Sequence, residues 1–331
     1  MRGVVQIKDP GRLAADLFRR LPERLDLDIY GTRIVVKATS SRALRRLRLV
    51  YGAFLARDQG PADARLALVE LDHAPHGWLA EALRPDDPLR IGGGHFLVAD
   101  WLPFALSLRD ETLLHYYASK FLRLHLVACH QPDHLTLHAA SLDVGGGHGI
   151  LLVGEAASGK TTLTLQLLDR GMSFCSDDTT VIRRRDRKCV PFPLAFILRG
   201  GPDGEAPDIP GVRERKPDLE LLDEPRWLVQ RNGDAGKAFT PVAIFFLHSR
   251  ADRQPGCPVP MNSAEAAMEL LRNKVVPMGL VHEDVAVMTA DFHLVCDLAN
   301  SAQCLSVNST DLARTRDSLL SHISGFAAVP A

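Results

Sequence analysis

Residues 149–154, GILLVG, form a continuous apolar run that leads directly into the glycine-rich stretch GEAASGKTT at 154–162. A run that is apolar at every position is typical of a strand buried on both faces of a parallel sheet. The following residues, 161–171, have the spacing of an amphipathic helix, and Gly171 is a suitable end for it. A buried strand, a glycine-rich loop and a helix in this order predict an α/β fold.

The loop itself matches the pattern G-x-x-x-x-G-K-[ST] of a phosphate-binding loop. Glycines allow successive backbone N–H groups to face phosphate oxygens, and the helix that follows directs the positive end of its dipole at them. Lys160 is expected to reach the β- and γ-phosphates, and the Thr161 hydroxyl to ligate Mg²⁺. We therefore expect ATP and Mg²⁺ as ligands, with the nucleotide bound by Gly154, Glu155, Ala156, Ala157, Ser158, Gly159, Lys160, Thr161 and Thr162.

Two adjacent carboxylates follow one helix and one short strand later, in Ser176-Asp177-Asp178. The end of a strand in an open α/β sheet faces the ligand crevice, and successive residues of a strand point in opposite directions. One carboxylate is expected to meet Mg²⁺, and the other to accept a proton from an attacking hydroxyl. The alternative is a pair of turn-forming aspartates without a chemical role.

The 331 residues are enough for two domains. We place the boundary near His130–Pro132, where a proline interrupts the helix predicted from Asp110 onward. This division predicts an added N-terminal α/β domain at 1–131, for substrate recognition or dimerisation, and a domain with the phosphate-binding loop at 132–331. Within the second domain, residues 200–238 are rich in Gly, Pro and charge and are expected to form a long surface loop or lid.

The remaining patterns in the second half predict regular structure. Residues 285–298 are expected to be strand, and residues 263–274 a helix capped by Asn262 and Glu265.

Composition and charge narrow the range of partners. The formal net charge of −1 gives no support to nucleic-acid or membrane-surface binding. No stretch is long and apolar enough for a membrane span, and the first residues do not fit a signal peptide. The six cysteines form no C-x-x-C pair and are expected to be reduced thiols. We therefore expect a cytoplasmic protein.

The segment 137–178 resembles the catalytic core of the HPr kinase/phosphorylase family. The family's elements occur here in the same order and spacing, as Leu137-His138-Ala139, ILLVGEAASGKTT, Asp169-Arg170-Gly171 and Ser176-Asp177-Asp178. The resemblance implies that Asp177 is the general base, that Asp178 lies on the metal side, and that His138 is an active-site histidine. It also implies a core shared with phosphoenolpyruvate carboxykinase, and the possibility of a homo-oligomer.

Other positions depart from that family. Thr161-Thr162 stands where the family has Ser-Glu, and this pair is closer to ATP-dependent phosphoenolpyruvate carboxykinase. The family's Ile-Glu-x-Arg-Gly signature is echoed by Phe196-Ile197-Leu198-Arg199-Gly200, in which Arg199 is kept and the glutamate is replaced. The better match is to HPr-kinase-related enzymes that act on other acceptors, among them peptides that are natural-product precursors. The resemblance covers roughly half of the chain, and its sharp motifs cover about forty residues.

These observations predict a kinase that transfers the γ-phosphoryl group of ATP to a hydroxyl, with a serine of a protein or peptide as the favoured acceptor. Lys160, Asp177, His138 and Arg199 are the expected catalytic residues, and Thr161 and Asp178 the expected metal ligands. Three alternatives stay open: a small-molecule kinase, a carboxykinase-like enzyme, and a non-catalytic regulatory protein that binds ATP.

Overall fold

The computed structural model describes residues 4–6, 10–70, 94–102, 104–200, 204–207, 209, 212, 214–221, 224–230, 235–249, 254–277 and 284–327. The chain forms two compact units. Unit 1 comprises Met1–Cys129 and Ala195–Arg231, and unit 2 comprises His130–Leu194 and Asn232–Ala331. Both units combine helices and sheets, so the chain is a mixed α/β protein. The two units differ from the expected division at 131/132, because residues 195–231 belong to unit 1.

Unit 2 is built on a six-stranded sheet whose strands lie in the order β10-β8-β9-β16-β18-β17. Its central strand, β16, pairs in parallel with β9 on one side and with β18 on the other. The strands are β10 (Ser173–Ser176), β8 (Ala139–Gly145), β9 (His148–Gly154), β16 (Thr240–His248), β18 (Gln303–Asn308) and β17 (Val259–Pro260). The strand, loop and helix expected around residues 149–171 are confirmed as β9 and α5 (Lys160–Leu168).

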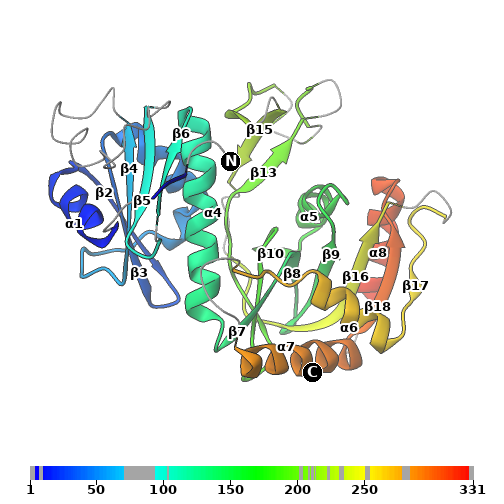
Figure 1. Cartoon of the computed structure of the whole chain (residues 1–331). Helices are drawn as coiled ribbons and strands as arrows, with labels where there is room; N and C mark the ends of the chain where they lie inside the picture. The colour runs from blue at the N-terminus through cyan, green and yellow to red at the C-terminus, as the bar shows by residue number, and fades with distance from the viewer. Residues whose placement is uncertain are drawn as a thin grey trace. The chain divides into compact units, whose positions relative to one another are not determined.

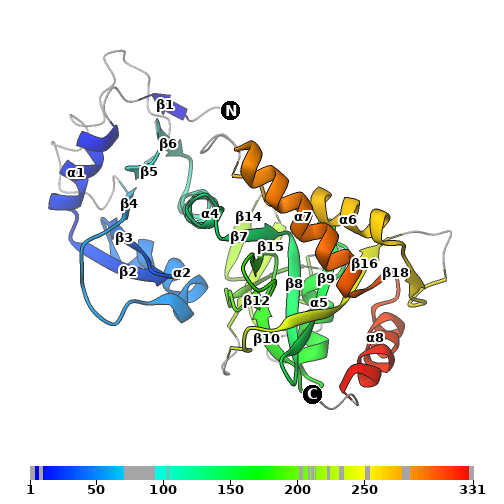
Figure 2. The ribbon, with the colours of Figure 1, turned by 90° about the horizontal axis from the view of Figure 1, so that it is seen from below.

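Helices cover both faces of this sheet (Figure 1 and Figure 2). Successive residues of β9 alternate between the two cores: Leu151 and Val153 pack with α6 (Ser263–Arg272) and α7 (Val285–Ser301), whereas Ile150 and Leu152 pack with α5 and α8 (Leu312–Ala327). A strand sandwiched in this way must be apolar on both faces, which explains the uninterrupted apolar run.

A second, three-stranded sheet of unit 2 has the order β12-β11-β7. Its strands are β7 (His134–Leu137), β11 (Thr180–Arg183) and β12 (Cys189–Val190). The chain passes from this sheet to the larger one between β7 and β8, at His138, and passes back between β10 and β11, at residues 177–179. The two crossings bring His138 and the paired aspartates to one corner.

An ion cluster ties α7 to the rest of unit 2. The buried carboxylate of Asp291 contacts Arg184 at 2.7 Å and Lys274 at 2.6 Å. Arg184 also donates to the main-chain oxygens of Gln131 and His134. The cluster therefore joins α7 to the turn after β11 and to the segment after α6.

Unit 1 contains a six-stranded sheet in the order β1-β6-β5-β4-β3-β2. Its elements are β1 (Val4–Gln6), α1 (Pro10–Arg20), β2 (Glu23–Ile29), β3 (Thr32–Ala38), α2 (Ser41–Val50), η1 (Gly52–Phe54), β4 (Ala64–Glu70), β5 (His95–Ala99), β6 (Phe104–Leu108) and α4 (Glu111–His130), whose last residue lies in unit 2. β3 and β4 are parallel neighbours, and α2 forms the crossover that such a pair requires. Leu13 and Leu17 of α1 pack on Val69 and Phe96 of the sheet.

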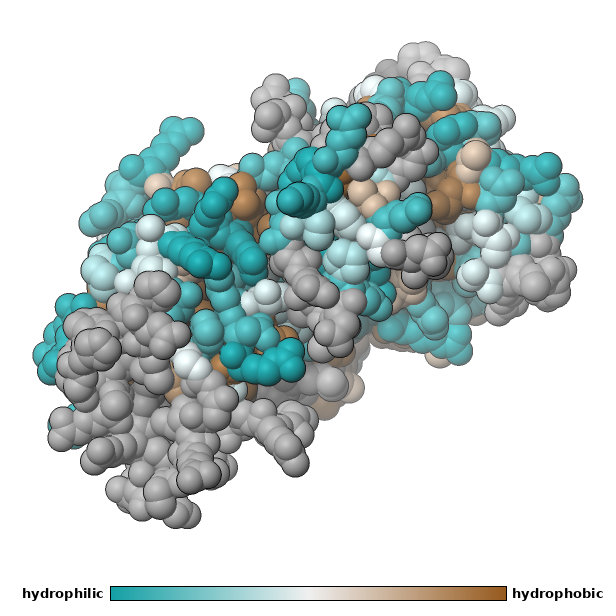
Figure 3. All heavy atoms as spheres, turned by 90° about the horizontal axis from the view of Figure 1, so that it is seen from above, coloured by the Kyte–Doolittle hydropathy of each residue, from teal (hydrophilic) through white to brown (hydrophobic). Residues whose placement is uncertain are grey.

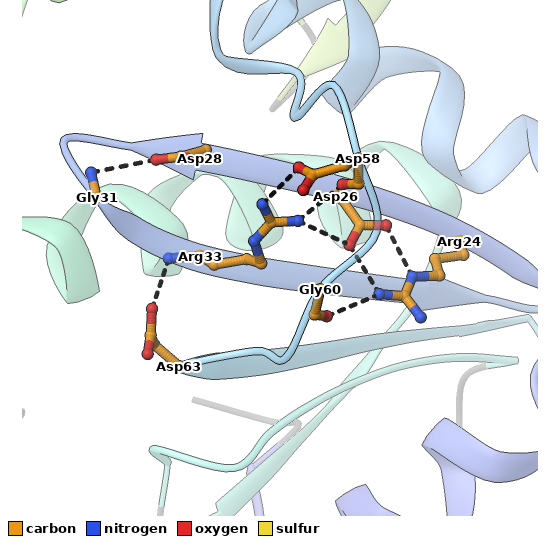
Figure 4. A network of polar contacts seen from close by, with 8 residues as sticks. All are labelled: Arg24, Asp26, Asp28, Gly31, Arg33, Asp58, Gly60 and Asp63. Carbon is orange, nitrogen blue, oxygen red and sulfur yellow. Dashed lines mark hydrogen bonds and ion pairs between the residues drawn. The ribbon is translucent and has the colours of Figure 1, made fainter.

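Charged side chains of the β2–β3 hairpin bind the segment that connects α2 to β4 (Figure 4). Arg24 donates to Asp26 at 2.7 Å and to the main-chain oxygen of Gly60 at 3.2 Å. Arg33 donates to the Asp58 carboxylate at 2.8 Å. The network holds a segment without regular structure, and it lies outside the unit that carries the candidate site.

Two segments differ from the sequence expectations. Residues 200–238 are expected to be a long loop, but the described part contains β14 (Leu219–Leu221) and β15 (Glu224–Val229). β15 pairs with β14 on one side and with β13 (Phe196–Arg199) on the other, in a sheet of unit 1. The expected strand at 285–298 is wrong, because this segment is the helix α7. Its buried residues, Asp291, Leu294, Val295, Leu298 and Ala299, have helical spacing, and Asp284 caps its first turn.

Asn262 caps α6 through the Glu265 N–H at 2.9 Å, which confirms the helix start expected from the sequence. Among the described residues, no helix has the length and apolarity needed to cross a bilayer. On the face drawn in Figure 3, hydrophilic side chains predominate among the described residues, and the apolar areas between them are small.

Candidate active site

The glycine-rich loop, residues 154–160, joins β9 to α5 at the carboxyl end of the parallel strands. Register pairs Gly154 with Leu247 of β16, and His248 of β16 with Asn308 of β18, so the three strands end level with one another. In an open α/β sheet, this edge is where ligands bind.

The loop curls around the ammonium group of Lys160. Lys160 Nζ donates to the main-chain oxygens of Gly154 at 2.7 Å and Glu155 at 2.8 Å, and the residue is only 5% exposed. Ala157 and Gly159 both have left-handed backbone conformations, with φ of 64° and 90°. The first turn of α5 has no side-chain cap, and the N-terminus of a helix favours a bound anion.

Glycine is required at the first position of the loop for a steric reason. A Cβ at Gly154 would lie 2.7 Å from the main-chain oxygen of Leu247 and 2.8 Å from Ser158 Oγ. The neighbouring strand could not move away from such an atom without disturbing the sheet. The absence of a side chain therefore lets the loop start directly against β16.

The residues that follow β18, Ser309 to Leu312, also support the loop, and no sequence motif predicts this role. Ser309 Oγ donates to the main-chain oxygen of Ser158 at 2.8 Å, and Leu312 lies against Gly159, where a Cβ would meet it at 2.6 Å. Ser309 lies in no recognisable motif. Only its position after a third parallel strand could have indicated a role.

Thr161 and Asp177 connect the loop to the corner of the two sheets. The Thr161 hydroxyl donates to Asp177 Oδ2 at 2.9 Å. Asp177 is buried at 8% exposure, and among the described residues no donor reaches its second oxygen, Oδ1. A buried carboxylate oxygen without a partner is costly, and a bound cation or a water molecule would offset that cost.

Asp178 and His138 form a second pair beside the first. Asp178 Oδ1 lies 2.5 Å from His138 Nε2, and the two side chains are 49% and 32% exposed. Asp178 has a left-handed φ of 60°, which an aspartate adopts more readily than most residues. The tight turn therefore directs one carboxylate into the protein and leaves the next one accessible.

Burial is the main cause of a large pKa shift at Asp177. Desolvation raises the pKa of its carboxyl group to about 7 from the model-compound value of 3.8, while the Thr161 hydrogen bond opposes this rise. The negative charge of Asp178 raises the pKa further, and Lys160 and His138 lower it. A cation bound at this carboxylate would favour its ionised form.

The donor atoms at the corner fit Mg²⁺ better than softer metals. Thr161 Oγ1 and the Asp177 carboxylate supply only oxygen, which Mg²⁺ prefers, and Mg²⁺ commonly uses one or two protein carboxylates together with phosphate oxygens and water. Within the described part of the chain, no group of three or more His, Cys, Asp or Glu side chains converges on one point. These residues thus suit a metal that arrives with a phosphate ligand.

The structure brings together most of the residues predicted from the sequence, but not all of them. Lys160, Thr161, Asp177, Asp178 and His138 belong to unit 2 and are linked by the contacts above. Arg199 ends β13 of unit 1, where it is exposed, so its expected catalytic role stays a prediction. Of the other loop residues, Glu155, Ala156 and Ala157 are exposed, Ser158 is buried, and Thr162 is half-buried.

Comparisons with known proteins add little to this geometry. No protein-family model matches the sequence, and no curated protein matches it. Among solved structures, the Hpr(Ser) kinase/phosphatase from Coxiella burnetii is similar at 14% sequence identity and a TM-score of 0.26. That similarity covers 58% of this chain and 99% of the other. A likeness at this TM-score assigns neither a family nor an activity to the chain.

Proposed function

We propose that the chain is an ATP- and Mg²⁺-dependent phosphotransferase, which transfers the γ-phosphoryl group to a hydroxyl. A serine of a protein or peptide is the favoured acceptor. The observation that carries the proposal is the bond from Thr161 to Asp177, which places a phosphate-type loop beside the half-exposed pair Asp178–His138. A phosphate site next to an accessible proton acceptor is what hydroxyl-directed transfer requires.

The loop would hold the nucleotide through backbone N–H groups and the N-terminus of α5. Lys160 already lies across the loop, and a short movement from the oxygens of Gly154 and Glu155 would bring its ammonium group to the β- and γ-phosphates. Positive charge there offsets the charge that develops as the bond to the leaving oxygen breaks.

Thr161 and Asp177 would hold the metal. When bound, Mg²⁺ would neutralise part of the charge on the phosphates. Thr161 Oγ1 and Asp177 Oδ1 would ligate the metal directly or through water, and the Asp177 carboxylate is more buried than the half-exposed Asp178 carboxylate. These contacts favour Asp177 on the metal side, the reverse of the roles that the family resemblance implies.

Asp178, assisted by His138, would then accept the acceptor's proton. As the acceptor oxygen bonds to the γ-phosphorus, its O–H bond breaks and the proton passes to the Asp178–His138 pair. The bond from the γ-phosphorus to the β–γ bridging oxygen breaks, and ADP departs with that electron pair. A base must come within about 3 Å of the hydroxyl, so accessibility favours Asp178 over the buried Asp177.

The test is transfer from γ-labelled ATP with Mg²⁺, using one pool of serine-containing peptides and one pool of small hydroxylated compounds. The proposal expects label in the peptide pool and none when EDTA is present. Label in the small compounds alone would indicate a small-molecule kinase. Binding of Mg·ATP without label in either pool, over a range of protein concentrations, would favour a regulatory ATP-binding protein and contradict the proposal.

A further inference from the structure

Three fully buried hydroxyl groups lie on the strands that carry the candidate site. Ser141 is in β8, Ser176 ends β10, and Thr180 begins β11; each has 0% exposure. Ser141 Oγ and Ser176 Oγ lie 2.6 Å apart, Ser176 Oγ and Thr180 Oγ1 lie 2.8 Å apart, and Thr180 Oγ1 donates to the main-chain oxygen of Ala139 at 2.9 Å. We name Ser141, Ser176 and Thr180 the hydroxyl ladder.

Proton counting gives the hydroxyl ladder one direction. Each hydroxyl can donate one hydrogen bond, and Thr180 donates its bond to the Ala139 oxygen. Ser176 therefore donates to Thr180, and Ser141 donates to Ser176. All three donors are used, and the chain of bonds ends on the residue next to His138.

The hydroxyl ladder lies where the backbone changes sheets. Ser176 pairs with Ser141 in the larger sheet, whereas Thr180 pairs with Leu137 in the smaller one. Between these pairs, His138 interrupts one crossing segment and residues 177–179 interrupt the other, so the regular pairing of neither sheet continues through this point. The hydroxyl bonds connect the two segments there.

The hydroxyl ladder and the main-chain oxygen that accepts its last bond lie close in sequence to the functional side chains. Ser176 precedes Asp177, and Thr180 is two residues after Asp178, while Ala139 follows His138. The main-chain N–H of His138 is separately fixed to the Asn273 oxygen at 2.6 Å. The contact of Asp178 with His138 thus depends on the spacing of two crossings that the hydroxyl ladder joins.

We infer that the hydroxyl ladder positions the proton-accepting pair, so that Ser176 and Thr180 are positioning residues for Asp178 and His138. The expected effect on kcat rests on the proposed function, whereas the expected effect on the contact between Asp178 and His138 does not. Loss of the Thr180 hydroxyl should let the two crossings separate and weaken the contact between Asp178 and His138.

The test compares Thr180→Val, which keeps the branched shape but removes the hydroxyl, with Thr180→Ser, which keeps the hydroxyl. The ring ¹⁵N resonances of His138, assigned with His138→Gln, report on the partner of Nε2. Thr180→Val is expected to move the Nε2 resonance toward its position in Asp178→Asn, and Thr180→Ser to leave it unchanged. For the same variants, kcat should fall about 10- to 100-fold in Thr180→Val and remain within about twofold in Thr180→Ser.

The Kd for Mg·ATP distinguishes a specific loss of positioning of Asp178 and His138 from a general disruption of the site. Its Kd should stay within about twofold in Thr180→Val, because the loop at 154–160 is not part of the hydroxyl ladder. If Thr180→Val does not fold, Ser176→Ala breaks the hydroxyl ladder at its middle and carries the same expectation for the His138 Nε2 resonance. A folded variant with an unchanged Nε2 resonance would overturn the inference, even if kcat fell. If the chain transfers phosphate to no acceptor, the proposed function fails, yet the resonance comparison still decides the role of the hydroxyl ladder.

Discussion

The hydroxyl of Thr161 donates a hydrogen bond of 2.9 Å to Asp177, which joins the first turn of α5 to the turn that follows β10. One residue further, Asp178 contacts His138. Two carboxylates adjacent in sequence therefore occupy different environments, one buried and one half-exposed. This difference underlies the roles proposed for them.

Changing Asp177 or Asp178 to asparagine is expected to affect different steps, Mg·ATP binding in the first case and phosphoryl transfer in the second. Asp177→Asn should weaken Mg·ATP binding at least about tenfold and remove its dependence on Mg²⁺, because a neutral amide is a poor metal ligand. Asp178→Asn should keep Mg·ATP binding within about twofold and lower transfer by about 10²- to 10⁴-fold. Calorimetry and labelled transfer measure the two effects, and the opposite pattern would restore Asp177 as the base.

Lys160→Ala should lower phosphoryl transfer by about 10²- to 10³-fold, because the cation proposed to contact the phosphates is lost. Lys237→Ala removes the same charge from an exposed position of unit 2 and serves as the matched control. Equal activity in the two variants would exclude Lys160 from the site.

Gly154→Ala should weaken nucleotide binding at least about tenfold, since its Cβ would contact the Leu247 oxygen at 2.7 Å and force the loop away from β16. Gly325→Ala, on α8, meets no atom within 4 Å and should raise stability by up to about 1 kcal/mol. Nucleotide titration and thermal unfolding of both variants measure these effects. Unchanged binding in Gly154→Ala would show that the loop tolerates displacement.

Stability should depend on pH through Asp177, whose pKa of about 7 lies above the model-compound value of 3.8. Below about pH 4 both the folded and unfolded chains carry the protonated group, and the penalty is absent. As pH rises to 7, the unfolded chain ionises first, so folding loses stability, by roughly 4 kcal/mol at most for a shift of this size. Asp177→Asn should therefore raise Tm more at pH 8 than at pH 4, and an equal change at both values would contradict the shift.

Asp291→Ala should lower the free energy of unfolding by about 3–5 kcal/mol, because it removes the buried carboxylate shared by Arg184 and Lys274, whose side chains are only 15% and 10% exposed. Asp297→Ala lies on the same helix but removes an exposed contact of 3.3 Å with Arg187, and should cost less than about 1 kcal/mol. Chemical denaturation of the two variants measures the difference. Similar values would mean that the cluster does not fasten α7.

The sequence alone determined those elements whose patterns lie within one short segment. The buried strand β9, the glycine-rich loop and α5 followed from an apolar run, two glycines and a helical period, and the start of α6 followed from its Asn262 cap. Segment 285–298 was misassigned because a run of Val, Met, Thr and Ala resembles a strand until the partners of each face are known. The placement of residues 195–231 in unit 1 likewise depends on contacts distant in sequence.

Only the tertiary structure decided which side chains meet at the corner. Sequence order places Asp177 and Asp178 side by side, but their partners depend on the register of β10 with β8 and of β11 with β7. The support from Ser309 and the hydroxyl ladder depend on the same register, and neither has a motif. A local pattern records what one segment prefers, whereas burial and hydrogen bonding between segments are set by how distant strands pair.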